Sequence, residues 1–158
     1  MTTQKGAVGF SFNCLIFFPR RFIQQSLMTM PRPHIFHARV YYEDTDHSGV
    51  VYHANYLKYF ERAREEIIGI DTLSDMWHHH ETGFAVYKAD LRYQDGAVFG
   101  DLLEIRTRWE KQGEYRLVFF HEAWRPKGNR PAVTCTLDLV CLGPGKKLLP
   151  IPDLPPFD

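Results

Sequence analysis

The feature that most constrains this chain is an acidic turn that joins a strand-like segment to a helix-like one. The turn, residues 44–49, reads Asp-Thr-Asp-His-Ser-Gly. Residues 36–43 before it alternate between apolar and polar side chains, which is the period of a half-buried strand. Residues 56–67 after it repeat apolar side chains at helical spacing. We therefore expect the carboxylates of the turn beside the first free N–H groups of a helix, where partial positive charge stabilises an oxygen that becomes negative.

A carboxylate facing such a site fits the hydrolysis of an activated acyl group, but other interpretations fit the turn as well. Its acids, Ser and Gly match the opening of an EF-hand calcium loop, yet the twelfth position holds Asn55 instead of a bidentate Glu. The Asp-x-Asp pair also occurs in phosphate-transferring enzymes, but no continuous apolar strand precedes it here. Finally, the carboxylates could only cap the helix by binding backbone N–H groups. The local sequence leaves catalysis and capping open.

Four strand-like runs follow the helix, over residues 85–93, 103–109, 115–124 and 132–142. Turns are expected at residues 112–113 and 127–129. One strand, one long helix ended by Gly69 and a series of antiparallel strands is an α+β order. Charged helix residues, Arg64 among them, are expected largely off the apolar face, and Glu61 is expected to face solvent or a neighbouring subunit.

A histidine triplet, residues 78–80, lies between the helix and the strands. Consecutive side chains point in different directions and cannot converge on one ion, so a surface loop is expected over residues 77–81 rather than a metal site.

Composition excludes several classes of protein. With 158 residues, 44% of them hydrophobic and 15% aromatic, the chain is long and apolar enough for one globular domain. Residues 1–42 hold five basic residues and no acid, which leaves a balance of −5 for the remainder. An acidic body without a basic stripe argues against nucleic-acid binding. Three cysteines without a paired spacing predict buried free thiols at Cys135 and Cys141 and a reducing cytoplasmic location.

We divide the chain into an extension over residues 1–30, a domain over residues 31–150 and a Pro-rich tail over residues 151–158. The apolar run of residues 10–18 in the extension is about half as long as a membrane span.

The run from Tyr42 to Tyr56, followed by Leu-Lys-Tyr-Phe-Glu-Arg-Ala-Arg over residues 57–64, resembles the signature of the 4-hydroxybenzoyl-CoA thioesterase family. It looks most like the Tol-Pal-associated acyl-CoA thioesterase branch, and the similarity covers residues 34–150. The resemblance implies the hotdog fold, in which a curved antiparallel sheet wraps one long helix. It also implies hydrolysis of acyl-CoA thioesters.

By this resemblance Asp46 is the catalytic residue, either as the base that activates water or as the nucleophile. Partial burial that raises its pKa would help it act as a base. The backbone N–H groups near His53 and Ala54 are the matching oxyanion donors. The side chains of His53 and Tyr42 match positions that assist, although core packing is an equal alternative for Tyr42. Asp44 is expected to shape the turn.

The same resemblance implies that coenzyme A enters as part of the substrate, that no metal or bound cofactor is needed, and that the subunits form a homodimer or homotetramer. A link to cell-envelope (Tol-Pal) or lipid-synthesis proteins is a further implication. A non-catalytic acyl-CoA-binding hotdog protein and a hotdog dehydratase or hydratase remain as alternatives.

One segment departs from the family pattern Tyr-x-x-Pro-x-x-x-Gly-Asp. Residues 93–101 follow it except that Gly96 stands where Pro is expected. Because this segment is expected near the substrate channel, the acyl preference is less well defined than the reaction type. Lys88, Arg92 and Arg116 are candidates for binding the coenzyme A phosphates, without a motif to rank them.

Overall fold

The computed structural model describes residues 32–154. The chain divides into two units, Met1–Met30 and Pro31–Asp158, and the described residues all belong to the second. The extension expected over residues 1–30 therefore lies outside the described residues.

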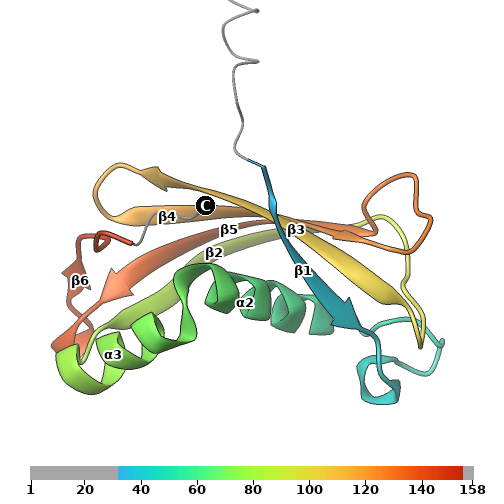
Figure 1. Cartoon of the computed structure of the whole chain (residues 1–158), viewed down its shortest axis with the longest axis horizontal. Helices are drawn as coiled ribbons and strands as arrows, with labels where there is room; N and C mark the ends of the chain where they lie inside the picture. The colour runs from blue at the N-terminus through green and yellow to red at the C-terminus, as the bar shows by residue number, and fades with distance from the viewer. Residues whose placement is uncertain (1–31, 155–158) are drawn as a thin grey trace, which may run out of the picture. The chain divides into compact units, whose positions relative to one another are not determined.

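The domain is built on one antiparallel sheet (Figure 1). Its strands are β1 (His34–Arg39), β2 (Gly83–Tyr93), β3 (Leu102–Gln112), β4 (Arg116–Trp124), β5 (Val133–Leu142) and the short β6 (Leu148–Leu149). The order across the sheet is β1-β3-β4-β5-β2, and β6 pairs with β5. The four strand-like runs of the sequence thus correspond to β2, β3, β4 and β5, with ends that differ by a few residues.

Two helices lie on the same face of the sheet (Figure 1). Helix α2 (Asn55–Ile68) is the expected long helix, and it ends at Gly69, whose φ of 93° suits glycine. Helix α3 (Ile70–His80) follows at once and was not expected. The interpretation of residues 77–81 as a loop is wrong, because the histidine triplet forms the last turn of α3, although its side chains are exposed as expected.

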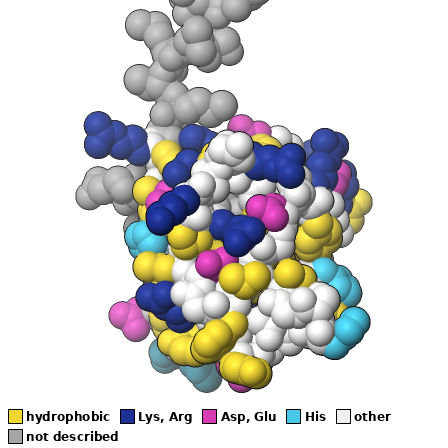
Figure 2. Space-filling model, turned by 90° about the vertical axis from the view of Figure 1, so that its right-hand side faces the viewer, with side chains coloured by type: hydrophobic (Ala, Val, Ile, Leu, Met, Phe, Trp, Pro, Cys, Tyr) yellow, Lys and Arg dark blue, Asp and Glu magenta, His cyan; other side chains and the backbone are white. Residues whose placement is uncertain are grey.

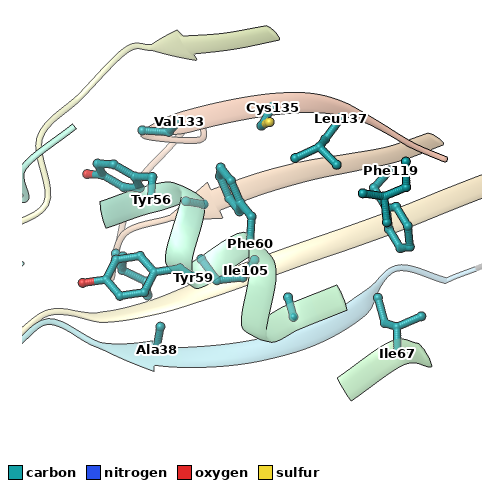
Figure 3. Packing of buried hydrophobic residues seen from close by; sticks show 14 of the residues in the cluster. Ala38, Tyr56, Tyr59, Phe60, Ile67, Ile105, Phe119, Val133, Cys135 and Leu137 are labelled. Carbon is teal, nitrogen blue, oxygen red and sulfur yellow. The ribbon is translucent and has the colours of Figure 1, made fainter. Parts of the chain in front are cut away.

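The core fills the space between α2 and the sheet (Figure 3). Tyr56, Phe60 and Ile67 project from α2, one turn or two apart, toward strand residues such as Phe119 and Leu137. This is the periodicity on which the helix was predicted, and burying one such side chain stabilises the fold by about 1.5–3 kcal/mol. The expected free thiols Cys135 and Cys141 are buried on β5.

A charged residue is also buried in this core, contrary to expectation. Arg64 of α2 is only 2% exposed, not at the surface. Its guanidinium pairs with Glu61, one helical turn back, and donates to Nε2 of the buried His121 at 3.2 Å. Since a guanidinium only donates, the His121 ring carries its proton on Nδ1, which lies 2.9 Å from the Thr107 hydroxyl. Periodicity assigns Arg64 to the helix flank but cannot show that β3 and β4 supply polar partners there.

The packed domain continues past residue 150. Ile151 is buried in the core, its N–H donates to the Glu114 carbonyl at 2.9 Å, and its carbonyl accepts from the Lys111 ammonium at 3.0 Å. The first part of the expected tail therefore packs against the β3–β4 hairpin.

Candidate active site

The acidic turn is a compact loop held by its own backbone. A single 3-10 turn, Tyr42–Asp44, begins it, so the strand-like alternation stops earlier than expected, at Arg39. The Asp46 N–H then donates to the Val50 carbonyl at 2.9 Å, and the Gly49 N–H donates to the Asp46 carbonyl at 3.0 Å. Gly49 has a φ of 83°, a conformation that side chains disfavour. Asp46 thus opens the tight turn that ends at Gly49.

Asp44 closes the base of this loop. Its buried carboxylate accepts the Tyr41 N–H at 2.8 Å. Its carbonyl accepts both the Tyr52 N–H at 2.8 Å and the Asn55 side-chain amide at 3.0 Å. The hydroxyl of buried Tyr59 has no hydrogen-bond partner of good geometry within the described residues. Its pKa is raised, first by burial and second by the nearby Asp44 carboxylate. Asp44 thus joins the loop to the start of α2.

Asp46 faces outward and is held by Ser48. The Asp46 Oδ1 accepts the Ser48 hydroxyl at 2.5 Å and the Ser48 N–H at 2.8 Å. These two bonds, the hydroxyl first, lower the pKa of Asp46, and the charges of His47 and His53 contribute smaller lowering effects. In the single chain the partial burial that would help Asp46 act as a base does not raise its pKa, because hydrogen bonds to the ionised form outweigh desolvation.

The start of α2 supplies free donors near this loop. The helix begins at Asn55 after Ala54, and the Asn55 N–H is already bound by the Tyr52 carbonyl. Within residues 32–154, neither the His53 N–H nor the Ala54 N–H makes a hydrogen bond. These are the two groups that the sequence predicted as oxyanion donors, and they are free to bind an anionic oxygen.

His53 is exposed and sits among aromatic rings. Its ring lies 4.3 Å from that of Tyr52 and 6.3 Å, edge-on, from that of Tyr93. The Tyr93 hydroxyl donates to the His53 carbonyl at 3.1 Å and so ties the end of β2 to the start of α2. The His53 side chain remains accessible to a bound molecule.

Tyr42 is not a core residue. Its side chain is 81% exposed, and its ring contacts Phe99 with 5.1 Å between centroids. Of the two alternatives for Tyr42, core packing is therefore wrong.

The segment that departs from the family pattern covers the acidic loop. The Val51 N–H donates to the Ala97 carbonyl at 2.8 Å, and Val50 pairs with Val98 in an isolated bridge. Gly96 lies so close that a Cβ there would be 2.8 Å from Val50 Cγ1. In this chain a glycine fits because the β-branched Val50 occupies the space that a larger residue would need.

Arginines fasten this covering segment to the rest of the domain. Arg39 donates to the Gly100 carbonyl at 2.7 Å, Arg130 donates to the Gln94 carbonyl at 3.0 Å, and Arg125 pairs with Asp95 and Asp101. Figure 2 shows Lys and Arg side chains gathered with hydrophobic ones on this end of the domain. Of the three candidates for phosphate binding, Arg116 is paired with Asp138, whereas Lys88 and Arg92 are exposed on β2.

Neither a metal-binding cluster nor a membrane-spanning helix is found in residues 32–154. Across the described part of the chain, no three His, Cys, Asp or Glu side chains are arranged to hold a metal ion. His79 and His80 instead lie beside Asp75 at 3.0 Å and 3.4 Å. No helix in residues 32–154 is long and apolar enough to cross a membrane.

Two contributors to the site were missed from the sequence. The sequence offers Ser48 only as a possible calcium ligand, although an Asp in a turn commonly accepts the backbone N–H two residues further on. Tyr93 reaches the start of α2 from 40 residues away, and only the fold reveals that contact.

A curved antiparallel sheet around a long helix, with an acidic loop at the start of that helix, defines a hotdog-fold protein of the thioesterase class. The chain belongs to the thioesterase-like superfamily, whose family profile matches residues 40–156.

Individual relatives agree with this assignment. The acyl-CoA thioesterase YbgC of Helicobacter pylori is 42% identical over 86 residues, which is 54% of this chain and 63% of the relative. The match thus spans less than two thirds of that protein. A 1,4-dihydroxy-2-naphthoyl-CoA hydrolase of Thermosynechococcus vestitus is 26% identical over 72% of this chain and 80% of its own length. The crystal structure of a probable thioesterase from Bartonella henselae superposes with a TM-score of 0.69 at 30% identity, over 76% of this chain and 99% of that one.

Proposed function

We propose that this protein hydrolyses acyl-CoA thioesters to a free acid and coenzyme A. Two observations support the proposal: the Asp46 carboxylate lies on the acidic loop, and the unengaged N–H groups of His53 and Ala54 lie at the start of α2, directly after that loop. The names of the Helicobacter pylori and Thermosynechococcus vestitus relatives, both coenzyme A thioester hydrolases, support the substrate class.

Thioester hydrolysis does not require the enzyme to protonate the leaving thiol. A thiol has a pKa of about 8.5, so the C–S bond breaks with departure of a thiolate that is readily protonated by water. The enzyme must supply an attacking oxygen and stabilise the carbonyl oxygen as it becomes negative. In the proposed arrangement the thioester carbonyl points at the His53 and Ala54 N–H groups and the attack comes from the side of Asp46.

Asp46 acts either as the base that takes a proton from the attacking water or as the nucleophile that forms an anhydride, which water then cleaves. The Ser48 bonds keep the carboxylate ionised at neutral pH, as both routes require. A bound substrate and a second subunit would both exclude water from Asp46 and so raise its pKa toward that of a useful base. The exposed side chains of His53 and Tyr42 are proposed to orient the water or the acyl group.

We further propose that the protein is at least a homodimer, joined through β2. This strand has 11 residues and lies at one edge of the sheet, where β5 is its one neighbouring strand among residues 32–154. It exposes Val86, Tyr87 and Tyr93, which are 51%, 69% and 49% exposed. A long, apolar edge strand left open is prone to pair with another strand, and a second copy of β2 offers an antiparallel partner by two-fold symmetry.

The buried free thiols of Cys135 and Cys141 support a reducing location, for which we propose the cytosol. The link to Tol-Pal or lipid-synthesis proteins remains a prediction of the family resemblance.

A panel of acyl-CoA substrates with short, long and aromatic acyl groups tests the function. Release of free thiol, followed with a thiol-reactive dye, is the expected result for at least one class. Binding of acyl-CoA without thiol release would contradict the proposal and favour a binding protein, whereas hydration of an enoyl-CoA without thiol release would favour a hydratase.

A further inference from the structure

The two N–H groups proposed to bind the carbonyl oxygen of the thioester belong to adjacent peptide groups of one turn. The Asn55 N–H donates to the Tyr52 carbonyl at 2.8 Å and closes this turn, and His53 and Ala54 are its two central residues. The His53 N–H shares a peptide group with the Tyr52 carbonyl, and the Ala54 N–H shares one with the His53 carbonyl. Because a peptide group is planar, the orientation of each carbonyl fixes the direction of the N–H beside it.

The two peptide groups are held in different ways. The hydrogen bond between Tyr52 and Asn55 holds the first one, which carries the His53 N–H. It does not hold the central peptide of the turn, whose orientation is the main difference between type I and type II turns. Ala54 has a φ of −73° and a ψ of −20°, near the values of a type I turn, whereas a type II turn would need a positive φ there. The backbone thus disfavours a complete flip of the central peptide but permits smaller rotations.

Tyr93, at the end of β2, restrains this central peptide. Its hydroxyl donates to the His53 carbonyl at 3.1 Å. The C=O and N–H of a trans peptide point in opposite directions, so a hydroxyl bound on the carbonyl side directs the Ala54 N–H away from Tyr93. The Tyr93 ring is placed edge-on to two others, 6.1 Å from that of Tyr56 on the first turn of α2 (Figure 3) and 6.3 Å from that of His53.

The same hydrogen bond also makes the Ala54 N–H a stronger donor. A donor bound to a peptide carbonyl draws electron density toward the oxygen and polarises the N–H of that peptide, which strengthens the next hydrogen bond by about 10–30%. The Tyr93 hydroxyl keeps its proton at neutral pH, because burial first and the nearby Cys135 second raise the pKa of Tyr93 above its ordinary value. The restraint and the polarisation are therefore both present at the pH of an ordinary assay.

We propose that Tyr93 is a positioning residue for the oxyanion site. Through the His53–Ala54 peptide, its hydroxyl aims and strengthens the N–H that binds the thioester oxygen as this oxygen becomes negative. The inference rests on the proposed function and adds a residue to it, although Tyr93 itself does not touch the reacting atoms. Because the Ala54 N–H interacts most strongly with a charged oxygen, loss of the Tyr93 hydroxyl slows turnover more than it weakens substrate binding.

Tyr93→Phe tests this role, since it removes the hydroxyl and keeps the ring contacts with His53 and Tyr56. With an acyl-CoA that the parent hydrolyses, kcat should fall about tenfold, which is less than the loss of about a hundredfold or more when a whole oxyanion donor is removed. KM should change by less than about twofold, because the ground-state carbonyl is uncharged. Thermal unfolding of the variant checks that the fold is intact.

Tyr115→Phe is the matched control. Tyr115 is an exposed tyrosine of the β3–β4 turn, and its hydroxyl makes no hydrogen bond within residues 32–154. This variant loses the same atom from a position remote from the start of α2, so it should keep the kcat and KM of the parent.

A graded change of the hydroxyl separates positioning of the oxyanion donor from a purely structural role. 3-Fluorotyrosine, placed at residue 93 by genetic-code expansion, has a more acidic hydroxyl that is a stronger donor in the same position. At neutral pH kcat should rise about twofold with KM unchanged, since a stronger bond to the His53 carbonyl polarises the Ala54 N–H further. A hydroxyl that only holds β2 against α2 would leave kcat as in the parent.

The inference would be overturned by a Tyr93→Phe protein that keeps the parent kcat, whether or not its KM rises. A kcat that 3-fluorotyrosine leaves unchanged would overturn it as well. Both results leave the proposed function standing. A parent protein that releases thiol from no acyl-CoA, or an Asp46→Asn protein as active as the parent, would instead contradict the proposed function.

Discussion

At the scale of single residues, the character of Asp46 depends on Ser48. A solvent-accessible carboxylate has an ordinary affinity for protons, and here the Ser48 hydroxyl and N–H bind its charged form. The result is an ionised, oriented oxygen that is a weak base until substrate or a second subunit excludes water.

Ser48→Ala should therefore move the titration of Asp46 to higher pH. The variant loses the hydroxyl, which makes the largest contribution to the lowered pKa of Asp46, and keeps the backbone N–H. NMR titration of the aspartate carboxyl carbons in parent and variant measures the change. An Asp46 pKa that stays the same or falls would contradict the role given to Ser48.

His121 makes a different prediction, about stability. Burial first, and the Arg64 charge second, hold the pKa of His121 well below the ordinary 6.5. His121 therefore stays neutral in the folded state at a pH where the unfolded chain binds a proton. The unfolded state then binds more protons below that pH, and stability is lost as the pH falls through about 6.5. The free energy of unfolding should drop by up to about 1.4 kcal/mol per pH unit for this one proton.

Denaturant unfolding of the parent and of His121→Gln between about pH 8 and pH 5 checks this prediction, since 6.5 is the ordinary histidine pKa. The variant should be less stable at pH 8, because Arg64 and Thr107 lose a partner, and its stability should depend less on pH. Equal slopes in both proteins would assign the acid sensitivity to other groups.

At the scale of elements, the acidic loop is stabilised by the segment that covers it. Val50 and Val51 pair with residues 97 and 98, and Gly96 permits the close approach. The family pattern offers a proline at Gly96, and only the position of Val50 explains why this chain has a glycine.

Gly96→Ala should destabilise the protein by about 1–3 kcal/mol, because the new methyl group would overlap the stiff Val50 side chain. Thermal unfolding measures the loss. Adding Val50→Ala removes the obstructing methyl groups and should recover part of the stability. If the double variant loses more stability than the two single variants lose together, close packing against Val50 is not the cause of the destabilisation by Gly96→Ala.

The sequence predicted long periodic elements well and polar tertiary contacts poorly. Alternation and helical spacing placed α2 and the four strands after it, because each buries one face against the same core. Helix α3 was not predicted because it is short, its apolar spacing rests on Ile70, Leu73 and Met76 alone, and its last turn is an exposed histidine triplet, residues 78–80. Arg64 and Tyr93 were missed because their partners are supplied by strands far away in the chain.

At the scale of the whole molecule, the open edge of β2 is the main argument for a dimer. Native mass spectrometry should give twice the chain mass of 18.5 kDa or a higher even multiple. Ala89→Glu puts like charges close to the proposed two-fold axis on both copies and should shift the population to monomer. Ile35→Glu changes a position that is also exposed, on the opposite edge strand, β1, and should leave the dimer intact. If Ile35→Glu dissociates the dimer and Ala89→Glu does not, the interface lies at β1, which contradicts the proposed dimer.

The proposed function requires the Asp46 carboxylate for hydrolysis, and substitution of that carboxylate tests the requirement. The rate of thiol release from an acyl-CoA substrate is compared for the parent, Asp46→Asn and Asp44→Asn. Asp46→Asn keeps the shape of the side chain but removes the basic, nucleophilic oxygen, so turnover should fall by at least about a hundredfold while folding and acyl-CoA binding persist. Asp44→Asn weakens the bond to the Tyr41 N–H and should cost about 1–2 kcal/mol of stability with a much smaller loss of turnover. An Asp46→Asn protein that releases thiol at close to the parent rate would contradict the account.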